Sequence, residues 1–260
     1  MQRHPVKTRT DLGPVELIEI AAETTVDLYA QGPAGGYHPF GNAWWTEDRC
    51  PVAFQYLSID SLYPAQYFGA ATGHPNPEQA DALYAYMQRV YRHVMGSDFF
   101  SVLELGTGGG EITQAFHRAG RDYLAVEGTT AGVTKLLEDG IAPDRIRQYN
   151  LKFMPALDRR FDLVMCTEIA EHIEPFFASK VVENCIRHAD AVWFSSADRN
   201  RPAHFHHINE QPIEVWDNLF AHMGFPFFVQ LNGTAERASR LYLGQTVGRR
   251  RRAAAPSSFV

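Results

Sequence analysis

Glu104-Leu105-Gly106-Thr107-Gly108-Gly109-Gly110 is the stretch that decides the fold, and it directly follows the apolar run at 99–103. The pattern predicts a buried strand, a tight glycine loop and a helix that begins at Glu111. Such a loop lets the backbone approach a ligand closely, and the first turn of the helix offers unpaired N–H donors. A dinucleotide-binding loop, G-x-G-x-x-G, would need glycine at position 111, so the sequence argues against a nicotinamide dinucleotide.

Strand and helix patterns alternate from position 97 onward, which predicts an α/β fold with a doubly wound, mostly parallel sheet. We expect seven strands, at 99–105, 122–127, 145–149, 161–166, 191–195, 226–230 and 240–246. Helices are expected at 111–119, 131–138, 175–188 and 212–223. Ligands bind open α/β sheets at the carboxyl ends of the strands, so the candidate site residues should gather at that edge.

The expected domain organisation has three parts. They are an N-terminal extension and helical, aromatic cap at 1–96, the main domain at 97–247, and a basic, disordered tail at 248–260. Apolar residues at helical spacing predict an amphipathic helix at 79–95 within the cap. Between Tyr37 and Phe68 the cap also holds nine aromatic residues, interrupted by glycine and proline. These aromatics either pack on the core or form a lid that closes over the site and excludes water.

The acid-x-G-x-G-x-G pattern from Glu104 to Gly110 resembles the first motif of class I S-adenosylmethionine (SAM) methyltransferases. The resemblance implies SAM as the cofactor and a Rossmann-like sheet that closes with an antiparallel hairpin. It also implies that Glu104 helps to hold the methionine end of SAM, and that Glu127 accepts both ribose hydroxyls. Asn150, after the third strand, is placed to contact the adenine edge. The implied cofactor-binding residues are Glu104, Gly106, Thr107, Gly108, Gly110, Glu127, Asn150 and Cys166.

A second group of ionisable residues follows the fourth strand, in Thr167-Glu168-Ile169-Ala170-Glu171-His172-Ile173. If this segment begins a helix, Glu168, Glu171 and His172 stand at positions i, i+3 and i+4 on one face. Two carboxylates and one imidazole at that spacing disfavour each other unless a cation lies between them. The alternative is that Glu168 only lines the cofactor pocket and that the other two residues cap a helix.

A histidine-rich loop, His204-Phe205-His206-His207, follows the fifth strand and is expected at the same edge of the sheet. Together with the ExxEH segment it resembles the metal site of small-RNA 3′-terminal 2′-O-methyltransferases. The run from 207 to 220 resembles bacterial small-molecule and sugar methyltransferases. The first resemblance implies a divalent metal, Mg²⁺ or Mn²⁺, held by Glu168, Glu171, His172 and His207. His206 or His204 would then serve as general base, and the expected catalytic residues are Glu171, His206 and His207.

The composition of the chain indicates in which cell compartment the protein is expected and which partners are disfavoured. The chain has 260 residues, 45% of them hydrophobic, which suits one large α/β domain with an extension. We expect a cytoplasmic protein without a membrane segment, because no stretch resembles a membrane span or a signal core and the three cysteines form no C-x-x-C pair. The net charge is −6 despite the basic run Arg249–Arg252, so nucleic acid is disfavoured as a partner without being excluded.

The sequence therefore predicts SAM-dependent methyl transfer to a hydroxyl of a small metabolite, such as a sugar or a natural-product intermediate. Methylation of an RNA 3′-terminal 2′-hydroxyl and N-methylation of a small molecule stay open as alternatives. A non-catalytic SAM-binding module is disfavoured by the complete glycine motif and by the ionisable residues at the same edge. The sequence leaves the acceptor and the oligomeric state open.

Overall fold

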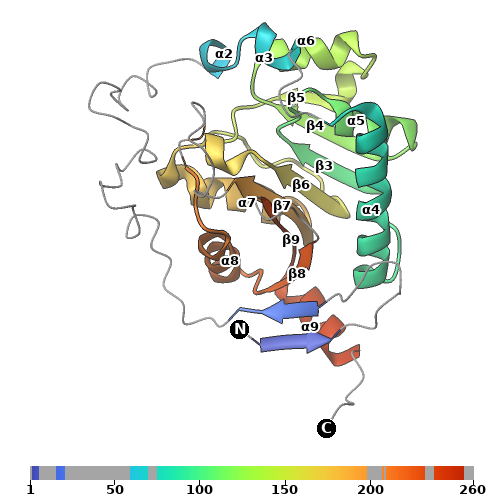
Figure 1. Ribbon diagram of the computed structural model, residues 1–260, viewed down its shortest axis with the longest axis vertical. Helices are drawn as coiled ribbons and strands as arrows, with labels where there is room; N and C mark the ends of the chain where they lie inside the picture. Colours follow the sequence, from blue (N-terminus) through green and yellow to red (C-terminus); the bar gives the residue numbers. More distant parts are fainter. Residues whose placement is uncertain are drawn as a thin grey trace.

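One mixed sheet organises the structure, which is a computed structural model that describes residues 2–5, 16–20, 59–69, 75–197, 207, 209–231 and 237–254. Its strands, in chain order, are β1 (Gln2–Pro5), β2 (Glu16–Glu19), β3 (Ser101–Leu105), β4 (Asp122–Glu127), β5 (Ile146–Gln148), β6 (Leu163–Thr167), β7 (Ala191–Ala197), β8 (Phe227–Leu231) and β9 (Arg237–Leu243). Within the described part of the chain these nine strands pair in the order β1-β2-β8-β9-β7-β6-β3-β4-β5 (Figure 1).

The strand directions confirm a doubly wound, mostly parallel sheet at its centre. Strands β7, β6, β3, β4 and β5 run parallel to one another. Strand β9 is antiparallel to both β7 and β8, which closes the sheet with the expected hairpin. The count of seven strands is wrong, because β1 and β2 add a second antiparallel hairpin at the edge of β8. Each of these two strands has only four residues, too few for a period-2 pattern to register in the sequence.

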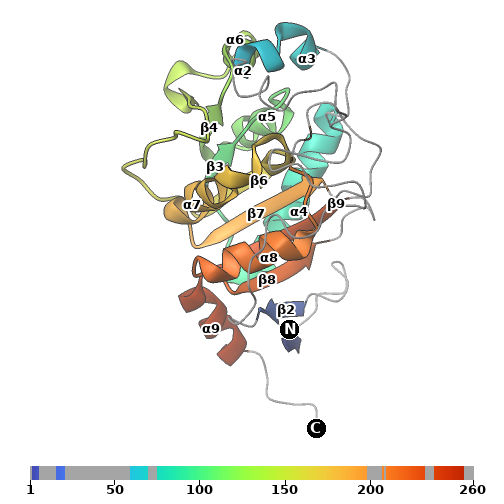
Figure 2. The same cartoon turned by 90° about the vertical axis from the view of Figure 1, so that its left-hand side faces the viewer.

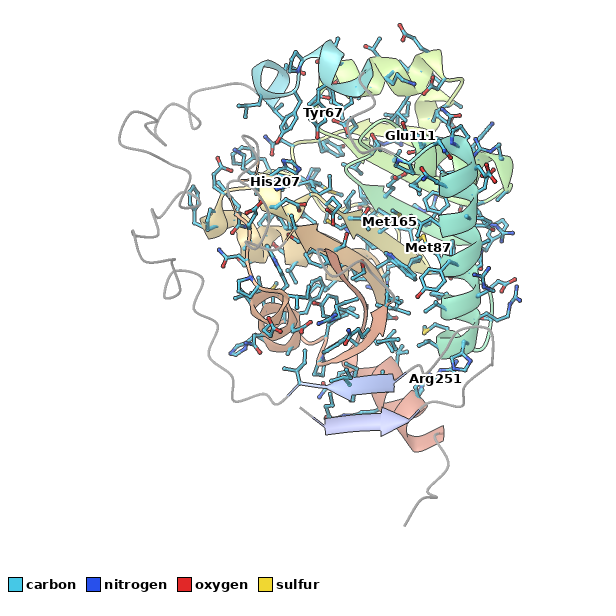
Figure 3. All side chains as sticks on the ribbon, viewed as in Figure 1. Tyr67, Met87, Glu111, Met165, His207 and Arg251 are labelled. Atoms are coloured by element: carbon cyan, nitrogen blue, oxygen red, sulfur yellow. The ribbon has the colours of Figure 1, made fainter. Side chains whose placement is uncertain are left out.

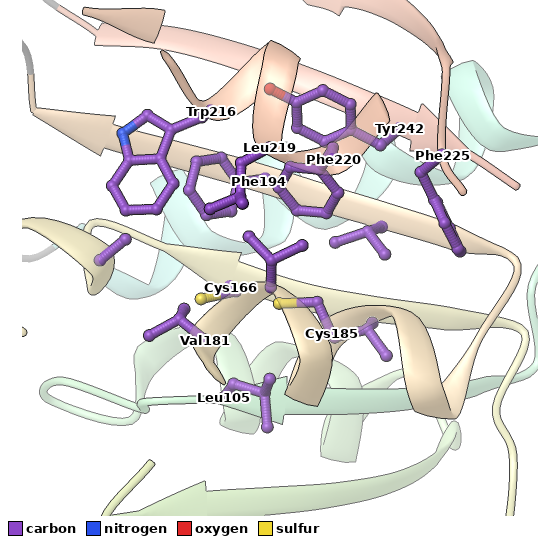
Figure 4. Packing of buried hydrophobic residues seen from close by; sticks show 14 of the residues in the cluster. Leu105, Cys166, Val181, Cys185, Phe194, Trp216, Leu219, Phe220, Phe225 and Tyr242 are labelled. Atoms are coloured by element: carbon purple, nitrogen blue, oxygen red, sulfur yellow. The ribbon is translucent and has the colours of Figure 1, made fainter. Parts of the chain in front are cut away.

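Helices cover both faces of the sheet (Figures 1 and 2). Helices α4 (Pro77–Met95), α5 (Glu111–Arg118) and α6 (Thr130–Glu138) contribute to the apolar core on one face. Helices α7 (Ala178–His188) and α8 (Ile213–His222) contribute to the core on the other face, where the rings of Phe220 and Tyr242 stack with their centroids 3.8 Å apart (Figure 4). None of the described helices combines the length and the apolar character needed to cross a bilayer.

The residues at the ends of α4 explain its bounds. Asn76 Oδ1 accepts a hydrogen bond from the Gln79 N–H at 2.8 Å, and the Gln79 side chain accepts one from the Asn76 N–H at 2.9 Å. Pro77 occupies the first turn, and Gly96 ends the helix in the left-handed conformation with φ of 84°. The amphipathic helix expected at 79–95 is therefore confirmed, with its start at Pro77.

Two parts of the expected domain organisation differ in the structure or lie outside it. The tail expected to be disordered from 248 is helical through residue 254, in α9 (Gln245–Ala254). Arginine favours helices, and Gly248 lets α9 pack closely on Phe227 of β8, where an added Cβ would lie 2.0 Å from the ring. Of the aromatic segment proposed as a lid, only 59–68 is described, in α2 (Ile59–Leu62) and α3 (Ala65–Gly69) beside α6 (Figure 1).

Candidate active site

The carboxyl ends of the parallel strands meet at one edge of the sheet, and the candidate residues gather there. Strands β3, β4, β6 and β7 end at this edge with Leu105, Glu127, Thr167 and Ala197. In the view of Figure 3, His207 and Tyr67 of α3 lie on the side away from α4. This is the place where open α/β sheets bind ligands.

The glycine loop leaves β3 in a conformation that suits glycine. The φ angles of Gly106, Gly108 and Gly110 are 78°, 53° and 86°, all in the left-handed region. A side chain is also excluded by space, because an added Cβ at Gly106 would lie 2.3 Å from Ile169 Cδ1. The loop therefore presents bare backbone at the edge, and α5 begins directly after it, as the sequence predicts.

Glu104 lies near the end of β3 and is buried, with 3% of its surface exposed. Its Oε2 accepts a hydrogen bond of 2.6 Å from the hydroxyl of Thr113 on α5. Burial raises the pKa of Glu104 from 4.5 to about 8, although the hydrogen bond from Thr113 opposes the rise. A buried carboxyl group with a raised pKa becomes ionised when a cationic partner lies beside it, because the partner stabilises the anion.

Glu127 ends β4, and two loops hold its carboxylate. Oε2 accepts hydrogen bonds from the N–H and the hydroxyl of Thr107, at 3.3 and 3.0 Å. Oε1 accepts two more from the N–H and the hydroxyl of Thr129, at 2.9 and 2.8 Å. The carboxylate therefore links the glycine loop to the loop that follows β4, at the position where the sequence predicts ribose binding.

The other two residues assigned to the cofactor have different surroundings. Asn150 is half-buried after β5, and its Oδ1 accepts a hydrogen bond from the Lys152 N–H at 3.0 Å. Cys166 has no exposed surface and lies beside Cys185 of α7 in the core (Figure 4). The alternation along β6 places this side chain on the face of the sheet that α7 covers, and the assignment of Cys166 to the cofactor pocket stays a prediction.

The ExxEH segment does not begin an α-helix, so the predicted i, i+3, i+4 face is wrong. The φ angle of Glu168 is 55°, outside the helical region, and only a 3₁₀ turn (Ala170–His172) follows. Ser195 at the end of β7 holds Glu168 twice. Its carbonyl accepts a hydrogen bond from the Glu168 N–H at 3.0 Å, and its hydroxyl donates to Glu168 Oε1 at 2.8 Å. Backbone strain of this kind tends to concentrate at functional sites.

Glu171 is completely buried, and the end of β7 also holds its carboxyl group. Oε2 accepts a hydrogen bond from the Ser196 hydroxyl at 3.2 Å, and Oε1 accepts one from the Ala197 N–H at 3.1 Å. Burial, followed by the charge of Glu168, raises the pKa of Glu171 to about 8. The backbone carbonyl accepts a hydrogen bond from the Asn209 N–H at 2.9 Å, which ties the start of the segment 209–212 to this turn.

Tertiary packing brings Glu171, His172 and His207 together. Each offers one ligand atom, and the three atoms lie within 4.8 Å of one another. The two imidazole rings meet edge to face, with their centroids 4.8 Å apart. Within the described ranges Glu168 does not belong to this group, so three of the four predicted metal ligands converge. His204 and His206 lie outside the described residues.

Two residues that the sequence did not single out hold the imidazoles. His207 Nδ1 lies 2.7 Å from Glu210 Oε1, and His172 Nδ1 lies 3.0 Å from the hydroxyl of Tyr63. A carboxylate can only accept, so Glu210 keeps a proton on His207 Nδ1 and makes Nε2 the nitrogen that can bind a ligand. The close spacing of His207 and Glu210 is a usable sequence signal. Tyr63 lies 109 positions from His172, so no local pattern could reveal it.

Comparison with known proteins identifies relatives of this fold. Residues 103–191 match a family model described as a methyltransferase domain. An S-adenosylmethionine-dependent methyltransferase from Clostridium acetobutylicum has the same fold, with a TM-score of 0.52 at 13% identity over 68% of this chain and 96% of that one. The chain carries a class I methyltransferase domain. The segment matched by the family model contains Glu104, Glu127 and the ExxEH residues, whereas Tyr63 and His207 lie outside it.

Curated relatives of the methyltransferase domain are similar over part of their length. The ubiquinone biosynthesis O-methyltransferase of Azotobacter vinelandii is 31% identical over 109 residues, which are 40% of this chain and 47% of that protein. The protein of the same name from Pseudomonas aeruginosa (strain UCBPP-PA14) is 28% identical over 136 residues, 50% of this chain and 52% of that protein. The chain thus spans about half the length of these relatives.

Proposed function

We propose that the chain transfers the methyl group of SAM to an oxygen of a small hydroxylated molecule. The observation that carries the cofactor assignment is the buried carboxyl group of Glu104 beside the glycine loop. The ammonium group of the methionine part of SAM would ionise this carboxyl group and pair with it. Glu127 at the next strand end would accept the ribose hydroxyls, and Asn150 would contact the adenine. The names of the curated relatives favour oxygen as the acceptor atom.

The acceptor side of the proposal rests on Glu171, His172 and His207. One carboxylate and two imidazoles, each imidazole with an oxygen at Nδ1, are a donor set that fits a divalent cation. The buried Glu171, whose pKa is raised to about 8, would be stabilised as the anion by such a cation. When bound, Mg²⁺ or Mn²⁺ would lower the pKa of an acceptor hydroxyl and orient it. Glu168, whose charge contributes to the raised pKa of Glu171, remains the proposed fourth ligand although it lies outside the group of three.

The protein's own groups then have distinct tasks. Ser196 and the Ala197 N–H orient the Glu171 carboxylate, and Glu210 holds the His207 ring. Methyl transfer needs an oxygen in line with the methyl carbon at about 3–3.5 Å, so positioning contributes most of the rate. A hydroxyl must also lose its proton, and His206 or His204 is the proposed general base for that step.

The test combines binding with turnover. S-adenosylhomocysteine should bind in calorimetry, and labelled SAM should transfer methyl groups to members of a panel of sugars and other hydroxylated metabolites. Chelated enzyme should be inactive until Mg²⁺ or Mn²⁺ is added. Glu171→Ala should lower kcat by at least about 100-fold while S-adenosylhomocysteine still binds, since it removes an acceptor-side group only.

The matched control is Glu174→Ala, which removes a nearby buried carboxylate paired with Lys152 Nζ at 3.0 Å. It should keep most of the turnover. Full activity in excess EDTA would contradict the metal without touching the cofactor assignment. Absence of S-adenosylhomocysteine binding would contradict the cofactor itself, and product formation of any kind would exclude a non-catalytic module.

A second candidate acceptor is the 3′-terminal ribose of an RNA. The convergence of Glu171, His172 and His207 favours it, because two vicinal hydroxyls could share one bound cation. The net charge of −6 opposes it. RNA and small polyols should therefore compete for labelled methyl groups in one assay. Labelling of RNA that disappears after periodate oxidation of its terminal diol would favour RNA, and labelling of an amine would move the proposal to N-methylation.

A further inference from the structure

A tyrosine of the N-terminal cap reaches the histidine group. Tyr63 follows α2, and its hydroxyl lies 3.0 Å from His172 Nδ1, with the ring centroids 5.7 Å apart and the rings at 79°. The contact is the counterpart of the one between Glu210 and His207, since an oxygen lies against Nδ1 in both imidazoles. In both histidines this arrangement directs Nε2 to any ligand.

Two further contacts fasten α2 beside the site. Asp60 Oδ1 accepts a hydrogen bond from the Thr130 N–H at 2.6 Å, and Oδ2 accepts one from the Thr130 hydroxyl at 3.2 Å, at the start of α6. Ile59 packs on Gly128, where an added Cβ would lie 2.7 Å from Ile59 Cδ1. Gly128 directly follows Glu127, so α2 rests on the loop proposed to bind the ribose while Tyr63 contacts the acceptor side.

We propose that Tyr63 is a positioning residue that sets the orientation and the proton of the His172 imidazole toward Glu171 and His207. The part of this inference that concerns metal binding rests on the proposed function. A hydroxyl can donate or accept, whereas a carboxylate only accepts. Tyr63 therefore holds the ring in both states. It accepts the Nδ1 proton when Nε2 binds a cation, and it donates to Nδ1 when the proton is on Nε2.

Mn²⁺ binding to the full chain, followed by the electron paramagnetic resonance of the unbound ion, tests this role. Tyr63→Phe should weaken Mn²⁺ binding by about tenfold or more, the effect of removing the partner of a ligating histidine. It should leave S-adenosylhomocysteine affinity unchanged. The matched control is Tyr123→Phe, because the Tyr123 hydroxyl lies 3.2 Å from Nδ1 of a histidine outside the site, His117. This control should equal wild type in both measurements.

A second measurement does not depend on the metal. In protein labelled with ¹⁵N-histidine and free of divalent ions, the nitrogen chemical shifts of His172 report which nitrogen carries the proton. Tyr63→Phe should move these shifts and leave those of His207, which Glu210 holds. Measurable and equal Mn²⁺ affinity in wild type and Tyr63→Phe, or unchanged His172 shifts, would overturn the inference. If wild type binds no Mn²⁺ and the His172 shifts still move, the metal proposal fails while the positioning role of Tyr63 is upheld.

Discussion

Glu104→Gln should become progressively more stable than wild type as the pH rises. Burial raises the pKa of Glu104 from 4.5 to about 8 in the folded protein. Between these values the unfolded chain has lost a proton that the folded protein retains, so wild type is destabilised as the pH rises through this window. Glutamine has nearly the same shape, can accept the hydrogen bond from the Thr113 hydroxyl and has no proton to lose.

Proton linkage for a single group gives the size of the effect. Well inside the window each pH unit lowers the free energy of unfolding of wild type by about 1.4 kcal/mol. From pH 6 to pH 8 the advantage of Glu104→Gln should therefore grow by about 2 kcal/mol, because Glu104 begins to ionise in the folded protein near the upper limit. The pKa of Glu171 is also raised to about 8, but this group acts equally in both proteins and cancels in the comparison.

Urea unfolding at pH 6, 7 and 8, without ligand, measures this difference. Glu138→Gln, an exposed carboxylate on α6, serves as the control and should change the free energy of unfolding by less than about 0.5 kcal/mol at each pH. Parallel pH profiles for wild type and Glu104→Gln would refute the reasoning. They would mean that the pKa of Glu104 in the folded protein is close to its value in the unfolded chain, so that burial does not raise it.

Three further outcomes follow from the site. At pH 7, binding of S-adenosylhomocysteine should release about one proton as Glu104 ionises beside the ligand's ammonium group. Calorimetry in buffers of different ionisation enthalpy measures this proton release, and equal heats in all buffers would contradict it. Gly106→Ala should abolish S-adenosylhomocysteine binding, because its Cβ would lie 2.3 Å from Ile169 Cδ1 and its φ of 78° disfavours alanine. Adding Ile169→Ala should restore part of the affinity, and unchanged binding in Gly106→Ala would contradict the role of the bare loop. Cys166→Ser should lower the free energy of unfolding by about 1–3 kcal/mol, because it buries a hydroxyl, and it should leave ligand affinity unchanged. A loss of affinity would instead support the assignment of Cys166 to the cofactor pocket.

Local patterns were sufficient for the elements that lie near the glycine loop in sequence. An apolar run before a loop of four glycines specifies β3, its loop and the start of α5 within a few residues, because each of these features depends on neighbours in the chain. The conformation of Glu168 was beyond such patterns. Its left-handed φ is held by Ser195 on β7, and ExxEH read alone has the spacing of a helix. Strands β1 and β2 were missed for a related reason, since pairing with β8 and with each other forms them.

The sequence by itself therefore determined the parallel centre of the sheet with its closing hairpin, the glycine loop and the carboxylates at the strand ends, all of which follow from short-range periodicity and turn chemistry. Only the tertiary structure decided which ionisable groups meet. Glu171, His172 and His207 converge because β6 and β7 end side by side. Tyr63 holds His172 across 109 positions of the chain, a distance that no spacing rule covers. Burial by the surrounding elements also raises the pKa of Glu104 and of Glu171, since desolvation of a carboxylate depends on every segment packed around it.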